Sequence, residues 1–209
     1  MKNTSLIIIG LTGGIASGKN FVANIFAQNG AVIFDADKQV HDLLELDEKT
    51  KKEVQKYFPE SVISNKIDRK SLGKEVFADK NKLEILENIL HPEVRKKYQE
   101  FLEKSQKEKK KIAILNIPLL LEKGGYECDY IVAITASPSL RKRRFLSRAR
   151  ISNPKEFSSQ KGSLEKKFEQ IISKQMSNRD RKLQADFIVN SAVSKENVRK
   201  QVCDILSAL

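Results

Sequence analysis

The 209-residue sequence contains no tryptophan, only two cysteines and no long hydrophobic run. Cys128 and Cys203 fit neither a zinc-ligand nor a CxxC spacing, so we expect two reduced thiols. The longest apolar stretch, 112–121, is about half as long as a membrane-spanning helix and contains Asn116 and Pro118. The N-terminus has no signal-peptide pattern. The sequence therefore predicts a cytoplasmic protein without a membrane partner.

The composition is that of a folded globular chain. Hydrophobic residues make up 40% and charged residues 32%, which excludes collagen-like, mucin-like and wholly disordered chains. A chain of this length buries roughly 70% of its unfolded surface, so no disulfide or metal is needed for stability. Lys and Arg number 39 against 27 Asp and Glu, a formal net charge of +12. This surplus favours polyanionic partners: nucleic acid, acidic lipid or phosphate-rich small molecules.

Short apolar runs alternate with amphipathic helical patterns at both ends of the chain. This alternation predicts an α/β fold with a parallel sheet and helices on both faces. The segment 37–111 shows helical, densely charged patterns and no convincing strand, which predicts a helical insertion. We expect Pro138 at a helix start and a polar mobile loop over 152–162. The predicted strands are 6–10, 31–34, 112–117, 130–135 and 187–190, and the predicted terminal helices are 18–29 and 195–209.

A phosphate-binding loop is the strongest signal in the sequence. The residues Gly13-Gly14-Ile15-Ala16-Ser17-Gly18-Lys19 match GxxxxGK and lie between a predicted buried strand and a predicted helix. Glycines let consecutive backbone N–H groups turn toward a phosphate, the helix N-terminus adds partial positive charge, and Lys19 reaches the outer phosphates. The pattern predicts nucleotide binding.

The residue after the lysine departs from the usual pattern. Ser or Thr normally stands there and its hydroxyl binds Mg²⁺, whereas this chain has Asn20. An amide oxygen can ligate Mg²⁺ directly or through water, but the side chain is longer and places it differently. We therefore expect nucleotide binding to survive and Asn20 to be the candidate metal ligand.

Acidic, basic and histidine side chains near the predicted strand ends offer further chemistry. Asp35 and Asp37 follow the second strand, where a carboxylate could take a proton, hold Mg²⁺ or cap the next helix. Arg141, Arg144 and Arg148 share one face of a predicted helix and could clamp a phosphoryl group or form a solvated or RNA-binding surface. Two histidines complete the set: His41 in a charged stretch, expected at the surface, and His91 in Leu90-His91-Pro92, expected at a junction between helices as a cap or ligand contact.

Motifs beyond the phosphate loop extend over nearly the whole chain. In order they are Ile9 to Lys19 as an opening signature, Phe34-Asp35-Ala36-Asp37, Asp68-Arg69, Leu90-His91-Pro92, Ile117-Pro118-Leu119-Leu120-Leu121-Glu122, Ser137-Pro138, Arg144 with Arg148, Gln175-Met176 and Ala185-Asp186 with Asn190. In this combination the chain resembles the dephospho-CoA kinase family. It departs from the family at Asn20 and in a stretch between Arg148 and Gln175 that is about a dozen residues longer.

The resemblance implies transfer of the ATP γ-phosphate to the ribose 3′-hydroxyl of dephospho-CoA, with ATP and Mg²⁺ as cofactors. It also implies a single P-loop kinase domain over 1–209: a nucleotide-binding core at 1–36, 112–140 and 183–209, a CoA-binding subdomain at 37–111 and a lid at 141–182. The implied catalytic residues are Asp37, Lys19 and Arg144. The implied ATP-binding residues are Thr12, Gly13, Gly14, Ile15, Ala16, Ser17, Gly18, Lys19, Asn20, Phe21, Arg148, Arg181 and Asn190. The implied acceptor-binding residues are Asp37, Arg69, His91, Pro118, Leu119 and Glu122.

Two other functions remain open at this point. A kinase for a nucleoside or nucleotide could use the same core, and acceptor preference would distinguish it. A basic nucleic-acid-binding protein that retains a phosphate loop would bind nucleic acid with a steep salt dependence, although the sequence has no helix-turn-helix, RNA-recognition or zinc signature. We expect a monomer or weak homo-oligomer without a specific nucleic-acid partner.

Overall fold

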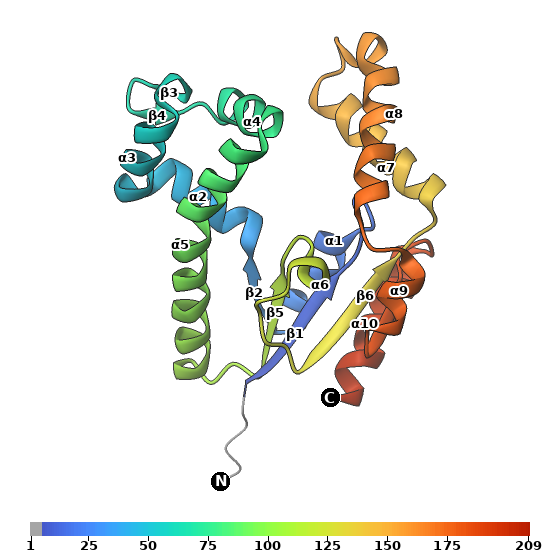
Figure 1. The fold of residues 1–209 in the computed structure, drawn as a ribbon. Coiled ribbons are helices and arrows are strands. Elements are labelled where there is room, and N and C mark those ends of the chain that lie inside the picture. Colours follow the sequence, from blue (N-terminus) through green and yellow to red (C-terminus); the bar gives the residue numbers. More distant parts are fainter. Residues whose placement is uncertain (1–5) are drawn as a thin grey trace. The chain divides into compact units, whose positions relative to one another are not determined.

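A five-stranded sheet forms the centre of the larger of two compact units in the computed structural model, which describes residues 6–209 (Figure 1). The strand β1 is parallel to β5 on one side and to β6 on the other, and β7 extends the sheet parallel to β6. In spatial order the strands are β2 (Val32–Asp35), β5 (Ile112–Asn116), β1 (Ile7–Thr12), β6 (Tyr130–Thr135) and β7 (Phe187–Asn190). The predicted α/β class is confirmed.

Each face of the sheet is covered by different helices. On one face, Ile9 and Leu11 of β1 are fully buried in a core cluster with α1 (Lys19–Gln28) and α10 (Lys195–Ala208). On the other face, α6 (Leu120–Lys123) lies so close that a Cβ on Gly10 would be 2.5 Å from Leu120. A glycine at position 10 is therefore what allows α6 to pack directly on β1.

Three more helices complete this unit. The helix α7 (Pro138–Ser152) begins at Pro138 as predicted, with Ser137 as its N-cap. It packs against α8 (Phe157–Lys174), and the rings of Phe145 and Phe168 lie 5.5 Å apart. The predicted mobile loop at 152–162 is wrong, because only 153–156 lie between the two helices. The short helix α9 (Asn178–Leu183) follows.

The second unit, Asp35–Glu108, is mainly helical. Its longest helix is α5, and α2, α3 and α4 each contact it. The sequence pattern missed a small antiparallel hairpin here, whose turn residues Ser64 and Asn65 both have positive φ. The predicted helix junction at Leu90-His91-Pro92 is also wrong, because Pro92 lies inside the continuous helix α5. The elements are α2 (Ala36–Leu46), α3 (Glu48–Tyr57), η1 (Pro59–Ser61), β3 (Val62–Ile63), β4 (Lys66–Ile67), α4 (Arg69–Ala78) and α5 (Lys80–Lys107).

No helix within residues 6–209 is long and apolar enough to cross a membrane. The expectation about a signal peptide depends partly on residues 1–5, which lie outside the described part of the chain.

Candidate functional site

The predicted phosphate loop connects the end of β1 to the start of α1. Ala16 and Gly18 both have positive φ, at 57° and 101°, and the N–H of Ser17 donates to the Gly14 carbonyl at 3.1 Å. Gly18 caps α1 without any side-chain hydrogen bond, and the first turn of the helix has no acidic residue. The N-terminal N–H groups of α1 and the partial positive charge there are thus available to a phosphate.

Ser17 and Lys19 are the two polar side chains of the loop. The Lys19 ammonium donates to the Gly13 carbonyl oxygen at 3.1 Å, so the lysine side chain lies over the loop. The hydroxyl oxygen of Ser17 is buried and has no hydrogen-bond partner in the protein. A buried polar group normally has a partner, so this hydroxyl is consistent with a polar ligand in the loop. Phe21 instead packs against the sheet core.

Arginines of α7 hold the phosphate loop from outside. Arg141 is buried and its Nε donates to the Ile15 carbonyl at 2.8 Å. Its Nη2 donates at 3.2 Å to Gln175, whose Oε1 also accepts from the Ile15 N–H at 2.9 Å. A Cβ on Gly14 would lie 2.2 Å from this guanidinium, so a larger residue at position 14 would displace Arg141 from its present place. Burial, and secondarily the charge of Arg181, lowers the pKa of Arg141.

Arg144 contacts the loop one turn further along α7. Its Nη1 donates to the Ser17 carbonyl at 3.3 Å and to the Ser191 hydroxyl at 2.9 Å, and its Nη2 donates to the Ser191 carbonyl at 2.6 Å. Burial, followed by the charges of Arg148 and Arg143, lowers the pKa of Arg144. Arg148 is exposed on the same helix. The predicted face of three arginines therefore has two members on the loop and one in solvent.

Arg181 and Glu122 form a buried ion pair beneath the loop. Arg181 is 1% exposed; its Nη1 donates to the Thr12 hydroxyl and its Nη2 to Glu122 at 2.7 Å. Glu122 also accepts from the Met176 N–H at 3.2 Å. Burial would raise the pKa of Glu122, but the hydrogen bond and charge of Arg181 outweigh it, so this pKa lies below its ordinary value. Three residues that the resemblance assigned to ligands thus bind one another.

Asn20 lies in the first turn of α1, and its Oδ1 accepts from Nδ2 of Asn116 at 3.1 Å. Asn116 is the last residue of β5, the strand beside β1. Among residues 6–209, no group of three or more His, Cys, Asp and Glu side chains could hold a metal ion. Asn20 Oδ1 would fit Mg²⁺ only as one neutral oxygen ligand. Phosphate oxygens would be needed to complete the coordination of the metal.

The two remaining predicted residues of this unit lie in turns. Leu119, after β5, has a φ of 54°, and Pro118 precedes it in the connection to α6. Asn190, at the end of β7, is exposed, and its Oδ1 accepts from the Ala192 N–H at 2.9 Å.

In the second unit, the structure separates the roles of the two aspartates after β2. Asp35 is the N-cap of α2, and its carboxylate accepts from the Lys38 N–H at 3.1 Å. Asp37 lies exposed in the first turn of the same helix. Asp35 therefore caps the helix, and the side chain of Asp37 is exposed.

A hollow of about 600 Å³ in the second unit contains Arg69. Arg69 donates to Nδ1 of His41 at 2.6 Å, and Nε2 of His41 lies 3.2 Å from Glu45. Because arginine only donates, His41 accepts at Nδ1 and carries its proton at Nε2. Lys51 and Lys66 line the same hollow. His41 is at the surface as predicted, and in addition it orients Arg69.

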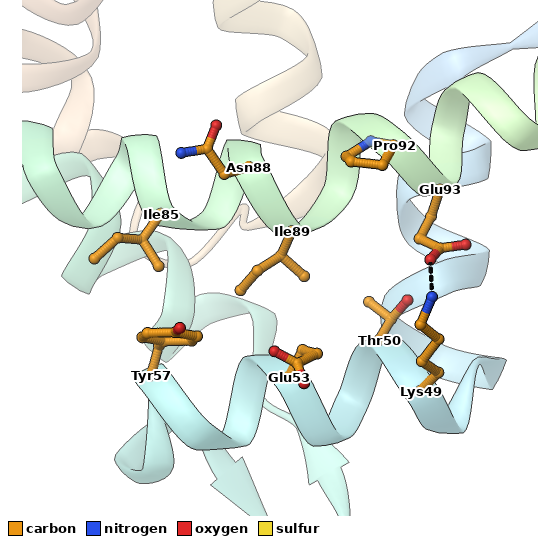
Figure 2. A pocket seen from close by; sticks show the side chains of 9 residues that line it. All are labelled: Lys49, Thr50, Glu53, Tyr57, Ile85, Asn88, Ile89, Pro92 and Glu93. Carbon is orange, nitrogen blue, oxygen red and sulfur yellow. Dashed lines mark hydrogen bonds and ion pairs between the residues drawn. The ribbon is translucent and has the colours of Figure 1, made fainter.

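A second hollow in this unit, of about 450 Å³, lies between α3 and α5 (Figure 2). Tyr57, Ile85 and Ile89 form its apolar side, and an ion pair between Lys49 and Glu93 at 2.6 Å closes one end. None of the predicted site residues lines it. His91 is exposed on α5 and caps no helix, since α5 continues through it.

The phosphate loop after the first strand, the parallel sheet and the arginine helix against the loop define a P-loop nucleotide-binding protein of the kinase type. Comparisons with known proteins support this class. The sequence model of dephospho-CoA kinase matches residues 7–196. The dephospho-CoA kinase of Bartonella quintana is 38% identical over 97% of each chain, and that of Wolbachia pipientis is 36% identical over 97% of this chain and 98% of the relative.

Solved structures agree with the sequence comparisons. The crystal structure of TT1252 from Thermus thermophilus is 29% identical, with a TM-score of 0.79 over 98% of both chains. Dephospho-CoA kinase from Campylobacter jejuni is 26% identical, with a TM-score of 0.59 over 96% of both. The chain belongs to the dephospho-CoA kinase family, whose reaction is the ATP-dependent phosphorylation of dephospho-CoA in CoA biosynthesis.

We predict that Glu122→Gln lowers the free energy of unfolding by about 2 kcal/mol at neutral pH, because Arg181 loses its buried counter-charge. The pKa of Glu122 is lower in the folded than in the unfolded protein, so its charge stabilises the fold above the unfolded-state pKa. This contribution disappears as the pH falls through the folded-state pKa. Urea unfolding at a series of pH values should show the gap between variant and parent closing below about pH 4.5.

Glu165→Gln on α8 is the matched control, because Glu165 makes only a surface ion pair, at 3.8 Å from Lys142. Its effect should stay within about 0.5 kcal/mol at every pH. A Glu122→Gln gap that is the same at pH 7 and pH 4 would contradict the ion-pair account.

Proposed function

We propose that this chain transfers the γ-phosphoryl group of ATP to the ribose 3′-hydroxyl of dephospho-CoA, using its phosphate loop and the arginines of α7. The observation that carries the proposal is the loop itself, whose backbone bends through Ala16 and Gly18 while Arg141 and Arg144 hold its carbonyls. A loop fixed before ATP arrives needs no reorganisation during the reaction. We also propose a cytoplasmic location, since ATP is the donor.

On the donor side, the backbone N–H groups of 13–19 and the Lys19 ammonium bind the β- and γ-phosphates in this proposal. Thr12 acts below the loop, where its hydroxyl already accepts from Arg181. Arg144 keeps the loop and Ser191 together and adds positive charge beside the phosphates. Arg148, exposed on the same helix, contacts the phosphoryl group as part of a lid over 141–182. Asn190 and Arg181 belong to the adenine side.

Asp37 is the proposed general base or orienting group for the acceptor hydroxyl. This proposal is supported by the two aspartates at the start of α2: Asp35 caps the helix, and Asp37 is exposed. A carboxylate that accepts the hydroxyl proton is the usual device in phosphoryl transfer to an alcohol.

The acceptor binds the helical unit 37–111 in this proposal. Dephospho-CoA is a polyanion, and the hollow around Arg69 has Lys51 and Lys66 on its lining. Arginine suits a diphosphate because its planar fork donates two parallel hydrogen bonds. Further proposed acceptor contacts are His91 and the turn with Pro118, Leu119 and Glu122. Glu122 contributes indirectly, through its hydrogen bonds with Arg181 and Met176.

Mg²⁺ is proposed as the metal of the reaction, held by Asn20 Oδ1 together with phosphate oxygens of ATP. When bound, it neutralises negative charge that develops on the phosphates. The residues of the chain bind and orient ATP, and Asp37 holds the acceptor proton.

We predict that ADP release requires dephospho-CoA and is lost in Lys19→Ala, because the outer phosphates lose their cation. Asp37→Asn should lower kcat by at least about a hundredfold and leave KM for ATP within about threefold. A coupled ADP assay with dephospho-CoA, adenosine, AMP, CMP and pantothenate measures both. Turnover with another acceptor in place of dephospho-CoA would contradict the proposed substrate, and a near-normal kcat in Asp37→Asn would remove that residue from catalysis.

We predict that Arg69→Ala raises KM for dephospho-CoA about tenfold and His41→Ala about threefold, with kcat and KM for ATP nearly unchanged. Because His41 acts through Arg69, the double variant should be no worse than Arg69→Ala alone. Lys70→Ala is the matched control, since it removes a neighbouring exposed charge outside the hollow. If the increase in KM of the double variant equals the product of the two single increases, His41 does not act through Arg69.

A further inference from the structure

The end of β5 and the first turn of α1 bring together two carboxamides. Asn116 Nδ2 donates to Asn20 Oδ1 at 3.1 Å, across 96 positions of sequence. Asn116 is 5% exposed and its Cα is paired with Leu11 of β1, two residues before the loop begins at Gly13. Asn20 is exposed, and it directly follows Lys19 in the sequence. The hydrogen bond therefore joins the buried Asn116 to Asn20, the residue that stands where a phosphate loop usually has Ser or Thr.

These two positions have a defined role in P-loop proteins in general. Mg²⁺ is held there by a Ser or Thr hydroxyl after the lysine and by an Asp at the end of a neighbouring strand. The hydroxyl can donate to the carboxylate and still offer a lone pair to the metal. In this chain both positions carry amides, so these two side chains contribute no negative charge. A carboxamide donates as well as accepts, so Asn116 can donate to Asn20 and keep the two positions hydrogen-bonded without a carboxylate.

Other carboxylates of this unit are engaged elsewhere. Glu122, shortly after β5, is paired with Arg181. Asp129 and Asp186 accept from the N–H groups of Ile8 and Ile131, at the opposite, N-terminal ends of β1 and β6. These three carboxylates are therefore bound to groups other than Asn20.

We infer that Asn20 and Asn116 form one neutral metal-facing unit, in which Asn116 is a positioning residue that fixes the orientation of the Asn20 amide. One lone pair of Asn20 Oδ1 accepts the Asn116 N–H, and the other is left for Mg²⁺ or a water on it. A neutral unit does not repel the triphosphate and attracts free Mg²⁺ only weakly. The chain thus takes Mg²⁺ as the ATP complex, and ATP binding depends little on the metal. This inference rests on the proposed function only for the identity of the nucleotide.

Calorimetric titration of ATP into the full chain, with Mg²⁺ and with EDTA, tests the inference without turnover. The quantity compared is the Mg²⁺ factor, defined as Kd in EDTA divided by Kd in Mg²⁺. The variants are Asn20→Ser, Asn116→Asp and the double variant. Asn81→Asp on α5 is the control, because it adds the same charge at an exposed position of the second unit.

Asn116→Asp places a carboxylate beside the phosphates, so ATP binding in EDTA should weaken and the Mg²⁺ factor should rise about tenfold. Asn20→Ser alone shortens the side chain that accepts from Asn116, so this hydrogen bond weakens, and it should change the factor by about threefold or less. In the double variant, the hydroxyl donates to the new carboxylate and keeps a lone pair for the metal. Its factor should exceed the product of the two single effects by about tenfold.

A double variant whose factor equals that product within about twofold would overturn the inference, as would an unchanged factor in Asn116→Asp. A thermal melt of each variant excludes unfolding as the cause, and the ratio of two Kd values on one protein cancels a general loss of binding. The failure of the proposed function gives a different result: ATP binds with the expected metal dependence, and turnover occurs with another acceptor or not at all.

Discussion

Ile15, in the middle of the phosphate loop, is held at both of its backbone polar atoms by side chains from distant parts of the chain. Arg141 donates to its carbonyl and Gln175 accepts from its N–H, and these two side chains are also hydrogen-bonded to each other. A loop has no repeating backbone hydrogen-bond pattern, and within this one the Ser17 N–H donates to the Gly14 carbonyl. The loop shape needed for phosphate binding therefore depends on α7 and on the segment after α8.

The other contacts to the loop extend the same arrangement. Arg144 and Ser191 fix the Ser17 carbonyl from α7 and the end of β7, and Arg181 holds Thr12 from α9. Helices that the family resemblance assigns to a lid thus also form the support of the loop. Positive charge accumulates beside the loop because these supports are guanidiniums, so the same groups that shape the loop also attract a triphosphate.

The sequence predicts the sheet well because its strands are short apolar runs bounded by polar residues. The expected strands 130–135 and 187–190 coincide with β6 and β7. It fails where tertiary packing decides. The polar segment 157–162 has the composition of a loop, yet it forms the start of α8, which packs on α7 through Phe168. Likewise, α5 continues through Pro92. The small hairpin has a two-residue turn, Ser64-Asn65, that contains no glycine.

The candidate site divides in the same way. GxxxxGK is a local pattern, and local spacing is enough to recognise the loop. Its supports are not local: Arg141, Gln175 and Ser191 lie 126, 160 and 174 positions from their loop partners, and Asn116 lies 96 from Asn20. A single sequence contains no signal for such pairs. The helical spacing of the α7 arginines is compatible with a phosphate clamp and with a solvated or RNA-binding surface, and it does not show that Arg141 binds the loop backbone.

The most direct test of this account is the ATP dissociation constant of Arg141→Ala, measured beside Gln175→Ala and the exposed control Arg143→Ala, with a thermal melt of each. The account predicts at least about tenfold weaker binding for Arg141→Ala, a smaller loss of about threefold for Gln175→Ala and no change beyond twofold for Arg143→Ala. A folded Arg141→Ala protein that binds ATP as tightly as the parent would contradict it, because the loop would then hold its shape without its external support.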